Sequence, residues 1–326
     1  MPKDSNPLVS LIVPTFNRVD QLEVTIAGIA AQTYENLELV IVDDGSEEHL
    51  VDRIEELTAP FTFAVRTLRL HRSNPDGNGP AFVRNQGVAI STGSLVAFCD
   101  DDDYWCDPDH LRVAVQRFEE DPELDYFFAN QRACREGTTA YNDWLPSLTT
   151  RIASRSPFAD RCYDIKRHDI LAEGHFPHLN TTVVRRELFD DIEGFRNDLR
   201  YSEDLDFFVR ATDVARKIVF RNDIVSVHNI PNPTIASHAS TRLTWRQRRL
   251  VVAAIADYLR LYCSSKEAQA YASRIEGVAY RDLSTALASE REWTKAHQFA
   301  KLACALLPTW RWRGYTAILG IRRRLS

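Results

Sequence analysis

The sequence of 326 residues lacks the features of several common protein classes. Its six cysteines include no C-x-x-C pair, which excludes a zinc ribbon and a thioredoxin-type motif. No uninterrupted run of about 18 apolar residues is present, so no segment is predicted to span a bilayer. The start, from Met1 to Pro7, is polar and has no long apolar core of the kind that marks a signal peptide. We therefore expect a cytoplasmic protein with reduced thiols, with peripheral attachment to the inner face of the plasma membrane as an option.

Two nucleotide-binding signatures are also missing. No G-x-G-x-x-G follows the first apolar run and no G-x-x-x-x-G-K-[ST] is present, so dinucleotide and P-loop sites are disfavoured. The net charge of -6 gives no reason to expect a nucleic-acid partner. The hydrophobic fraction of 44% and the charged fraction of 26% are ordinary for a globular protein, and the length allows one large domain with a smaller one.

The first hundred residues alternate between short apolar runs and amphipathic segments. Apolar runs of strand length occupy residues 8–13, 37–42 and 95–99, and the segment from Val65 to Leu70 resembles a further strand. The segments between them carry apolar residues at helical spacing, as at Leu22, Ile26 and Ile29. This alternation predicts an α/β fold with a doubly wound parallel sheet.

Four consecutive carboxylates, Asp100 to Asp103, follow the run that ends at Cys99. In an open parallel sheet the carboxyl ends of the strands meet at one edge, where ligands bind. Clustered carboxylates repel one another, and a bound cation offsets that cost. Oxygen ligands favour Mg²⁺ or Mn²⁺, which in turn hold phosphate oxygens. The alternative is a solvated acidic turn before the helix that starts after Asp107-Pro108.

Polar residues follow two other predicted strands, at Pro14 to Arg18 and at Asp43-Asp44. Each group alone could be a turn or a helix cap. Together with the cations Arg18 and Arg84, acids at two strand ends suit a nucleotide diphosphate bound with a metal.

Four motifs in order resemble those of family 2 glycosyltransferases with the GT-A fold. They are V-S-L-I-V-P-T-F-N-R at 9–18, I-V-D-D-G-S at 41–46, G-P-A-F-V-R-N at 79–85 and the acidic run at 100–103. The resemblance covers about the first two-thirds of the chain. It implies a doubly wound mixed sheet and an inverting transferase that uses a nucleotide-diphospho-sugar, expected to be UDP-linked, with Mn²⁺ or Mg²⁺.

The same resemblance implies roles for individual residues. Asp44 would contact the base with help from Thr15, and Arg84 would face the diphosphate or the base. Asp100 and Asp102 would form the D-x-D pair, with Asp102 as the direct metal ligand. The donor-binding set that follows is Pro14, Thr15, Asn17, Arg18, Asp44, Arg84, Asp100 and Asp101, with Asp101 near the ribose. Asp103 is expected only to stabilise the turn.

A second informative stretch lies at 201–210, Y-S-E-D-L-D-F-F-V-R. Ser202 can cap a helix whose first turn holds Glu203 and Asp204, where the helix dipole favours charged carboxylates. These acids could serve the helix start alone. The stretch also resembles the E-D element of the family, which implies that Asp204 is the general base. Glu203, on the acceptor side, is expected to orient the site or to bond backbone.

The segment from Arg135 to Arg161 is polar with little periodicity, and we expect an acceptor-side flap. Trp144 and Tyr141 would offer stacking surfaces for a sugar; alternatively, Trp144 only anchors the loop. Asn180 and Thr181 match positions where the family places small polar residues close to the acceptor and donor sugar.

Four histidines accompany these late elements. His228 follows two short closing strands, at 218–220 and 224–227, and matches a family histidine that approaches the metal or diphosphate. His238 is a second candidate for that position. His175 and His178 are expected to be loop or hydrogen-bonding residues rather than metal ligands.

From Thr244 onward no strand pattern remains, and two apolar stripes predict antiparallel helices packed on the catalytic domain. We expect a catalytic domain at 1–235 and a helical region at 236–326. The final segment, from Trp310 to Arg324, is basic and aromatic. It is either a helix that lies on an anionic membrane or a terminal helix that packs through its aromatic residues.

The sequence therefore predicts an enzyme that moves a sugar from a nucleotide donor to a hydroxyl of a glycan or lipid-linked acceptor, as in cell-surface polysaccharide synthesis. A nucleotidyltransferase is less well supported, because no glycine-rich loop with a lysine follows the first strand. A nucleotide-sugar-binding protein without turnover is a third alternative, and the presence of Asp102 together with Asp204 argues against it. The sequence leaves the sugar, the linkage and the oligomeric state open.

Overall fold

The computed structural model describes residues 6–72, 75–172, 176–230 and 243–325. The chain divides into two compact units, Met1–Pro233 and Thr234–Ser326. The predicted domain boundary at residue 235, His175 and His238 lie outside the described residues.

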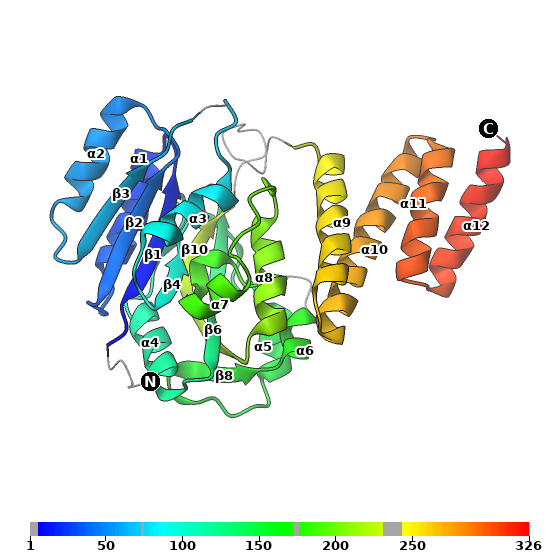
Figure 1. Cartoon of the computed structure of the whole chain (residues 1–326). Helices are drawn as coiled ribbons and strands as arrows, with labels where there is room; N and C mark the ends of the chain where they lie inside the picture. Colours follow the sequence, from blue (N-terminus) through cyan, green and yellow to red (C-terminus); the bar gives the residue numbers. More distant parts are fainter. Residues whose placement is uncertain (1–5, 73–74, 173–175, 231–242, 326) are drawn as a thin grey trace. The chain divides into compact units, whose positions relative to one another are not determined.

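The first unit is built on one mixed β-sheet, with strands in the order β3-β2-β1-β4-β9-β6-β10-β5 (Figure 1). The strands along this order are β3 (Ala64–Arg69), β2 (Leu37–Asp43), β1 (Val9–Thr15), β4 (Leu95–Phe98), β9 (Thr182–Arg185), β6 (Leu124–Arg135), β10 (Lys217–Asn229) and β5 (Tyr104–Trp105). β1 to β4 run parallel, whereas β9 is antiparallel to both β4 and β6. The predicted α/β fold with a doubly wound mixed sheet is confirmed.

Helices cover both faces of this sheet. Alternate residues of β1 explain why: Leu11 belongs to a core shared with α1, α2 and α4, whereas Ile12 faces the opposite helix α3. There α3 approaches so closely that a Cβ on Gly87 would lie 2.5 Å from Ile12 Cγ2. β1 is buried along nearly its whole length, as expected for a strand covered on both sides. The helices are α1 (Val19–Ala30), α2 (Glu48–Thr58), α3 (Pro80–Ile90), α4 (His110–Glu120), α7 (Arg186–Asp191) and α8 (Glu203–Val214).

An aromatic cluster fixes α7 and α8 against the sheet. Phe98 of β4 contacts Phe195 and Phe207, with ring centroids 5.3 and 6.1 Å apart. All three rings are buried. This packing brings the first turn of α8 close to the end of β4, although more than a hundred residues separate them in sequence.

Parallel register places three strand ends at one edge of the sheet. Thr15 of β1 pairs with Asp43 of β2, and Ile12 pairs with Phe98 of β4. The polar residues that follow these three strands therefore share that edge.

Two expectations about later elements are wrong. The polar segment at 135–161 is not an irregular loop: it contains β7 (Thr138–Tyr141), which pairs with β6, and α5 (Pro146–Ile152). The two predicted closing strands form one strand, β10, whose pairing with β6 is irregular between Arg221 and Ser226. The remaining short elements are η1 (Ala159–Arg161), β8 (Cys162–Ile165), α6 (Arg167–Leu171) and η2 (Leu179–Thr181).

The second unit is helical. Its elements are α9 (Trp245–Tyr262), α10 (Lys266–Ser289), α11 (Trp293–Leu306) and α12 (Trp310–Leu325), and each packs on the one before it (Figure 1). Within the described ranges, no helix combines the length and the apolar character that crossing a membrane requires.

Candidate active site

Arg84 joins the acidic run to the start of α8. Its guanidinium donates hydrogen bonds to Asp100 Oδ1 at 2.5 Å and to Glu203 Oε1 at 2.7 Å. The arginine is 5% exposed, so both ion pairs are largely withdrawn from water. Burial alone would raise the pKa of Asp100, but the Arg84 charge lowers it below its usual value. Asp100 is therefore held as a carboxylate.

Along the acidic run, partly exposed and buried side chains alternate. The side chains of Asp100 and Asp102 are 23% and 19% exposed, whereas those of Asp101 and Asp103 are 7% and 1% exposed. The first pair is therefore the more accessible to a ligand at the sheet edge. This is the pair expected as the D-x-D motif.

Asp101 is held from inside by the loop after β1. Thr15 Oγ1 donates to Asp101 Oδ2 at 2.8 Å, and Arg18 Nη1 lies 3.0 Å from oxygens of both Asp101 and Asp102. Burial raises the pKa of Asp101 to about 7, with Arg18 opposing and Asp102 adding to the shift. Arg18 therefore bridges the buried and the accessible acids.

Asp44 anchors a separate group on the outer side of the same edge. Its carboxylate accepts hydrogen bonds from the backbone N–H of Asn78 at 3.1 Å and from Asn78 Nδ2 at 2.6 Å. Arg72 lies 3.5 Å above the Phe16 ring and 3.7 Å from Asp44. Sequence reasoning missed Phe16, Arg72 and Asn78, although the loop that carries the last two is rich in glycine and polar residues.

The loop between β1 and α1 is tied to this group by its backbone. Asn17 has a left-handed backbone (φ 52°); its N–H donates to Ser46 Oγ at 2.8 Å, and its Oδ1 accepts from Glu47 N. Pro14 lies within β1, paired with Val42 of β2. Asn17 and Pro14 thus shape the edge.

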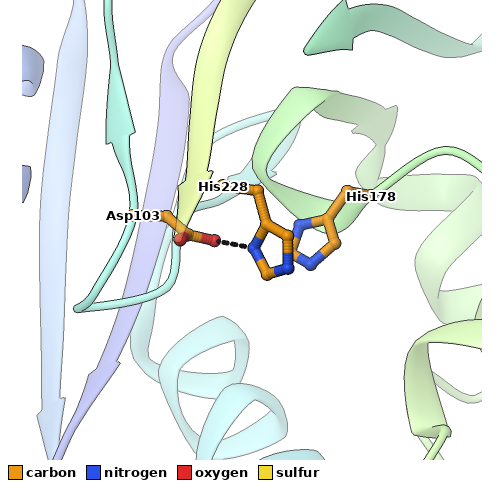
Figure 2. A group of neighbouring side chains, drawn as sticks. All are labelled: Asp103, His178 and His228. Carbon is orange, nitrogen blue, oxygen red and sulfur yellow. Dashed lines mark hydrogen bonds and ion pairs between the residues drawn. The ribbon is translucent and has the colours of Figure 1, made fainter. Parts of the chain in front are cut away.

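Asp103 connects the acidic run to β10 and to η2. Its carboxylate lies 2.8 Å from His228 Nδ1, accepts the Asn229 N–H at 2.6 Å and also accepts from Asn180 Nδ2. Figure 2 shows His228 between Asp103 and His178. The expectation that Asp103 only stabilises its turn is incomplete, because these contacts join three distant segments.

The pKa values of the two histidines are shifted in opposite directions. Burial by itself would lower the pKa of His228, but Asp103 raises it to about 9. Burial, followed by the neighbouring His228, lowers the pKa of His178 to about 3. Their ring centroids are 4.5 Å apart, so a positive charge on one ring opposes a positive charge on the other.

Trp144 belongs to the same cluster rather than to an isolated flap. Its ring packs edge-on against His228 and His178, and its Nε1 donates to the Phe176 carbonyl at 2.9 Å. Tyr141 packs against Trp144 on the outside and is 50% exposed. Trp144 thus anchors this segment, whereas Tyr141 remains accessible.

Asn180 and Thr181 are both fully buried. The Asn180 Oδ1 accepts the backbone N–H of Asp100 at 2.9 Å, while its carbonyl accepts from Trp105 Nε1 at 2.6 Å. Thr181 Oγ1 donates to the His178 carbonyl. Asn180 therefore shapes the acidic turn, and Thr181 shapes the turn that carries His178.

Asp204 lies in the first turn of α8, beside Glu203. Burial, followed by the negative charge of Glu203, raises its pKa to about 7. Its Oδ1 accepts the Leu205 N–H at 2.8 Å. The expected cap by Ser202 is wrong, because that residue has a left-handed backbone (φ 58°) and its side chain makes no cap bond.

Several side chains of the site carry atoms that can ligate a metal ion. One oxygen of Asp103 and one nitrogen each of His178 and His228 lie within 4.8 Å of one another (Figure 2). The predicted ligands Asp100 and Asp102 present accessible oxygens at the same turn. Carboxylates with an imidazole fit a divalent cation such as Mn²⁺. The side chains present are therefore compatible with a metal.

The fold is that of a GT-A glycosyltransferase, and the candidate site lies at the edge formed by β1, β2 and β4. The chain belongs to glycosyl transferase family 2, whose model matches residues 10–192. The predicted family and the predicted enzyme class are confirmed.

Curated relatives agree with this assignment. An uncharacterized glycosyltransferase of Haemophilus influenzae is 27% identical over 203 residues, 62% of this chain and 61% of the relative. The colanic acid biosynthesis glycosyl transferase WcaA of Escherichia coli is 28% identical over 208 residues, 63% of this chain and 66% of that protein. A glucosyl-dolichyl phosphate glucuronosyltransferase of Haloferax volcanii is 34% identical over 139 residues, 42% of this chain and 39% of that one. The chain spans less than two thirds of each of these relatives.

Two solved structures share the fold over nearly the whole chain. S. aureus TarS 1-349 in complex with UDP-GlcNAc matches with a TM-score of 0.66 at 19% identity, covering 97% of this chain and 87% of that one. The mannosyltransferase PcManGT from Pyrobaculum calidifontis, in complex with GDP-Man and Mn²⁺, matches with a TM-score of 0.60 at 21% identity, covering 99% and 88%.

Proposed function

We propose that this glycosyltransferase is metal-dependent and inverting, and that it transfers a sugar from a UDP-linked donor to a hydroxyl of a glycan or lipid-linked acceptor in cell-surface polysaccharide synthesis. The observation that carries the proposal is the pair of bonds from Arg84 to Asp100 and Glu203. It joins the acids assigned to the donor and metal to the helix turn that presents Asp204.

Donor binding is assigned to the edge of β1, β2 and β4. Asp44 accepts hydrogen bonds from the base, and the partly exposed Phe16–Arg72 stack beside it provides a flat surface for that base. Thr15 and Arg18 hold Asp101 toward the ribose. Asn17 and Pro14 fix the loop on which these groups depend.

The general base is assigned to Asp204. An inverting transfer needs one carboxylate that takes the proton of the acceptor hydroxyl as its oxygen attacks the anomeric carbon. A pKa near 7 leaves Asp204 ionised for a substantial fraction of molecules at neutral pH and basic enough to accept the proton. Glu203, fixed by Arg84, positions it from the neighbouring residue.

Asp102, Asp100 and His228 would hold the divalent ion, either Mn²⁺ or Mg²⁺. Asp103 binds His228 Nδ1, which fixes the ring and leaves Nε2 for another ligand. When bound, such an ion neutralises the negative charge that develops on the diphosphate leaving group. Asp103, with Asn180 and Asn229, keeps the turn in the conformation that exposes Asp102.

Acceptor recognition is assigned to the rim around Tyr141 and Trp144. Tyr141 is accessible for stacking on a sugar, and Trp144 supports it from below. The relatives named for colanic acid synthesis and for a dolichyl phosphate acceptor support polymer-linked or lipid-linked acceptors.

A panel of UDP-sugars and GDP-sugars tests the proposal. Thermal unfolding is measured with each nucleotide sugar, with and without Mn²⁺, because a bound ligand raises the midpoint. Compounds that bind are then assayed for transfer to glycan and lipid-phosphate acceptors. We expect one UDP-sugar to raise the midpoint only with the metal and to be transferred with inversion. Transfer at full rate in EDTA, or with retention, would contradict the proposal.

A further inference from the structure

The last helix, α12, has two faces of opposite character. One face packs on α11: Leu319 is 1% exposed, and Trp312 Nε1 donates to the Ala300 carbonyl at 3.0 Å. Tyr315 and Trp312 also pack against the core of the second unit. The sequence-based alternative of a helix that packs through its aromatic residues therefore holds for this face only.

The other face of α12 is apolar and exposed. Ile318, Ile321 and Leu325 are 54%, 60% and 83% exposed, and Trp310 is 78% exposed. Their spacing of three, four and eight residues places them along one stripe of a helix with 3.6 residues per turn. Folding does not explain this stripe, because its side chains stay exposed and contribute nothing to the core.

Arginines border this stripe on both sides. By helical spacing Arg311 and Arg322 lie along one border, and Arg313 and Arg324 along the other. In the part of the chain that the structure describes, none of these four is paired with a carboxylate. The segment from Trp293 to Ser326 contains seven lysines and arginines and no acid, although the whole chain has a net charge of -6. The positive charge is thus concentrated beside the apolar stripe.

A hollow of about 660 Å³ lies at the start of α12, and its lining includes Arg281 of α10 and Arg311. Arg281 donates to the Leu307 carbonyl at 2.5 Å, while its buried Nε has no hydrogen-bond partner. Trp310 forms part of the rim. Two guanidinium groups beside an exposed indole suit a lipid phosphate at the level of the headgroups.

We propose that α12 is a membrane-surface helix, which lies in the plane of an anionic bilayer with its apolar stripe among the upper acyl chains and its bordering arginines on lipid phosphates. The charge complementarity selects anionic lipid as the occupant, since a second copy of this chain would oppose its own arginines. This inference does not depend on the donor, the metal or the catalytic base.

Vesicle sedimentation with the full chain tests it. Phosphatidylcholine vesicles with and without phosphatidylglycerol are the probes, and the bound fraction yields a partition coefficient. We expect binding to the anionic vesicles, little to the neutral ones, and weakening at high salt. The variant Ile318→Ser with Ile321→Ser should bind roughly 100-fold more weakly. Arg322→Gln with Arg324→Gln should bind roughly 30-fold more weakly.

Matched control variants distinguish binding through α12 from non-specific binding to the vesicles. Leu261→Ser with Val278→Ser removes two exposed apolar side chains from α9 and α10, and Lys266→Gln with Arg291→Gln removes two charges outside α12. Both should bind like the unmodified protein. Equal binding to neutral and anionic vesicles, or equal losses in the controls, would overturn the proposal. So would self-association in vesicle-free solution that Ile318→Ser with Ile321→Ser abolishes, since the stripe would then be a protein interface.

Discussion

Arg84 of α3 and Asp100, at the end of the central strand β4, form an ion pair of 2.5 Å that is largely withdrawn from water. The same guanidinium holds Glu203 at 2.7 Å, so one side chain fixes the distance between the acidic run and the first turn of α8. The acidic run and the helix turn that holds Asp204 are therefore coupled through the Arg84 side chain.

Loss of this coupling should cost stability. Arg84→Met is expected to lower the free energy of unfolding by about 3–5 kcal/mol, because the buried Glu203 and the partly buried Asp100 both lose their counter-charge. Adding Glu203→Gln should restore part of this loss, since one of those charges is removed. Urea denaturation of both variants measures the difference. If the second substitution lowers stability further, Arg84 does not act through Glu203.

Asp102 should control metal-dependent nucleotide binding. In Asp102→Asn, the rise in melting midpoint that UDP and Mn²⁺ give together is expected to disappear, because the accessible carboxylate ligand is lost. Asp52→Asn, an exposed acid on α2, is the matched control and should keep the full rise. An unchanged rise in Asp102→Asn would remove this residue from the proposed ligand set.

Transfer activity should fall in acid with a midpoint near pH 7. Burial and Glu203 raise the pKa of Asp204 to about 7, so the carboxylate that accepts the proton is lost as the pH falls below that value. Glu203→Gln removes the neighbouring negative charge and should move the acid limb of kcat/KM to lower pH. A limb that stays in place would show that another group controls it.

The buried His110 should make folding sensitive to acid. Burial, aided by the Arg221 charge, lowers its pKa to about 3, below the ordinary value of about 6.5. The unfolded chain thus binds the proton more tightly. As the pH decreases from about 6.5 to about 3, the free energy of unfolding should fall by about 1.4 kcal/mol per pH unit. His110→Phe keeps a ring beside Trp105 and should reduce this slope. Identical slopes in denaturation experiments across this range would contradict the argument.

The sequence predicts the central sheet well because its strands are short apolar runs buried on both faces. β1 and β2 are nearly free of exposed residues, and the helix between them has a clear apolar stripe. β7 is different: all four of its residues, Thr138–Tyr141, are exposed. Without a buried face it has no alternating pattern, and its pairing with β6 alone makes it a strand.

The residues of the candidate site were predictable where they follow directly after a strand. Asp44, Asp100 and Asp102 follow strands directly, so their shared edge follows from parallel topology. The contacts of Asp103 with Asn180 and His228 span 77 and 125 residues. Only the packing of β9, β6 and β10 brings these segments together, and no local pattern reports it.

We propose Asp204 as the base of a glycosyl transfer whose donor is bound elsewhere, by Asp44, Asp100 and Asp102. The most direct measurement compares Asp204→Asn with the unmodified protein for donor affinity by calorimetry and for single-turnover transfer. This role of Asp204 predicts an unchanged Kd for the donor with Mn²⁺ and a transfer rate lower by roughly 10²–10⁴-fold, the range for loss of a general base. Transfer at the unmodified rate with unchanged donor affinity would contradict it.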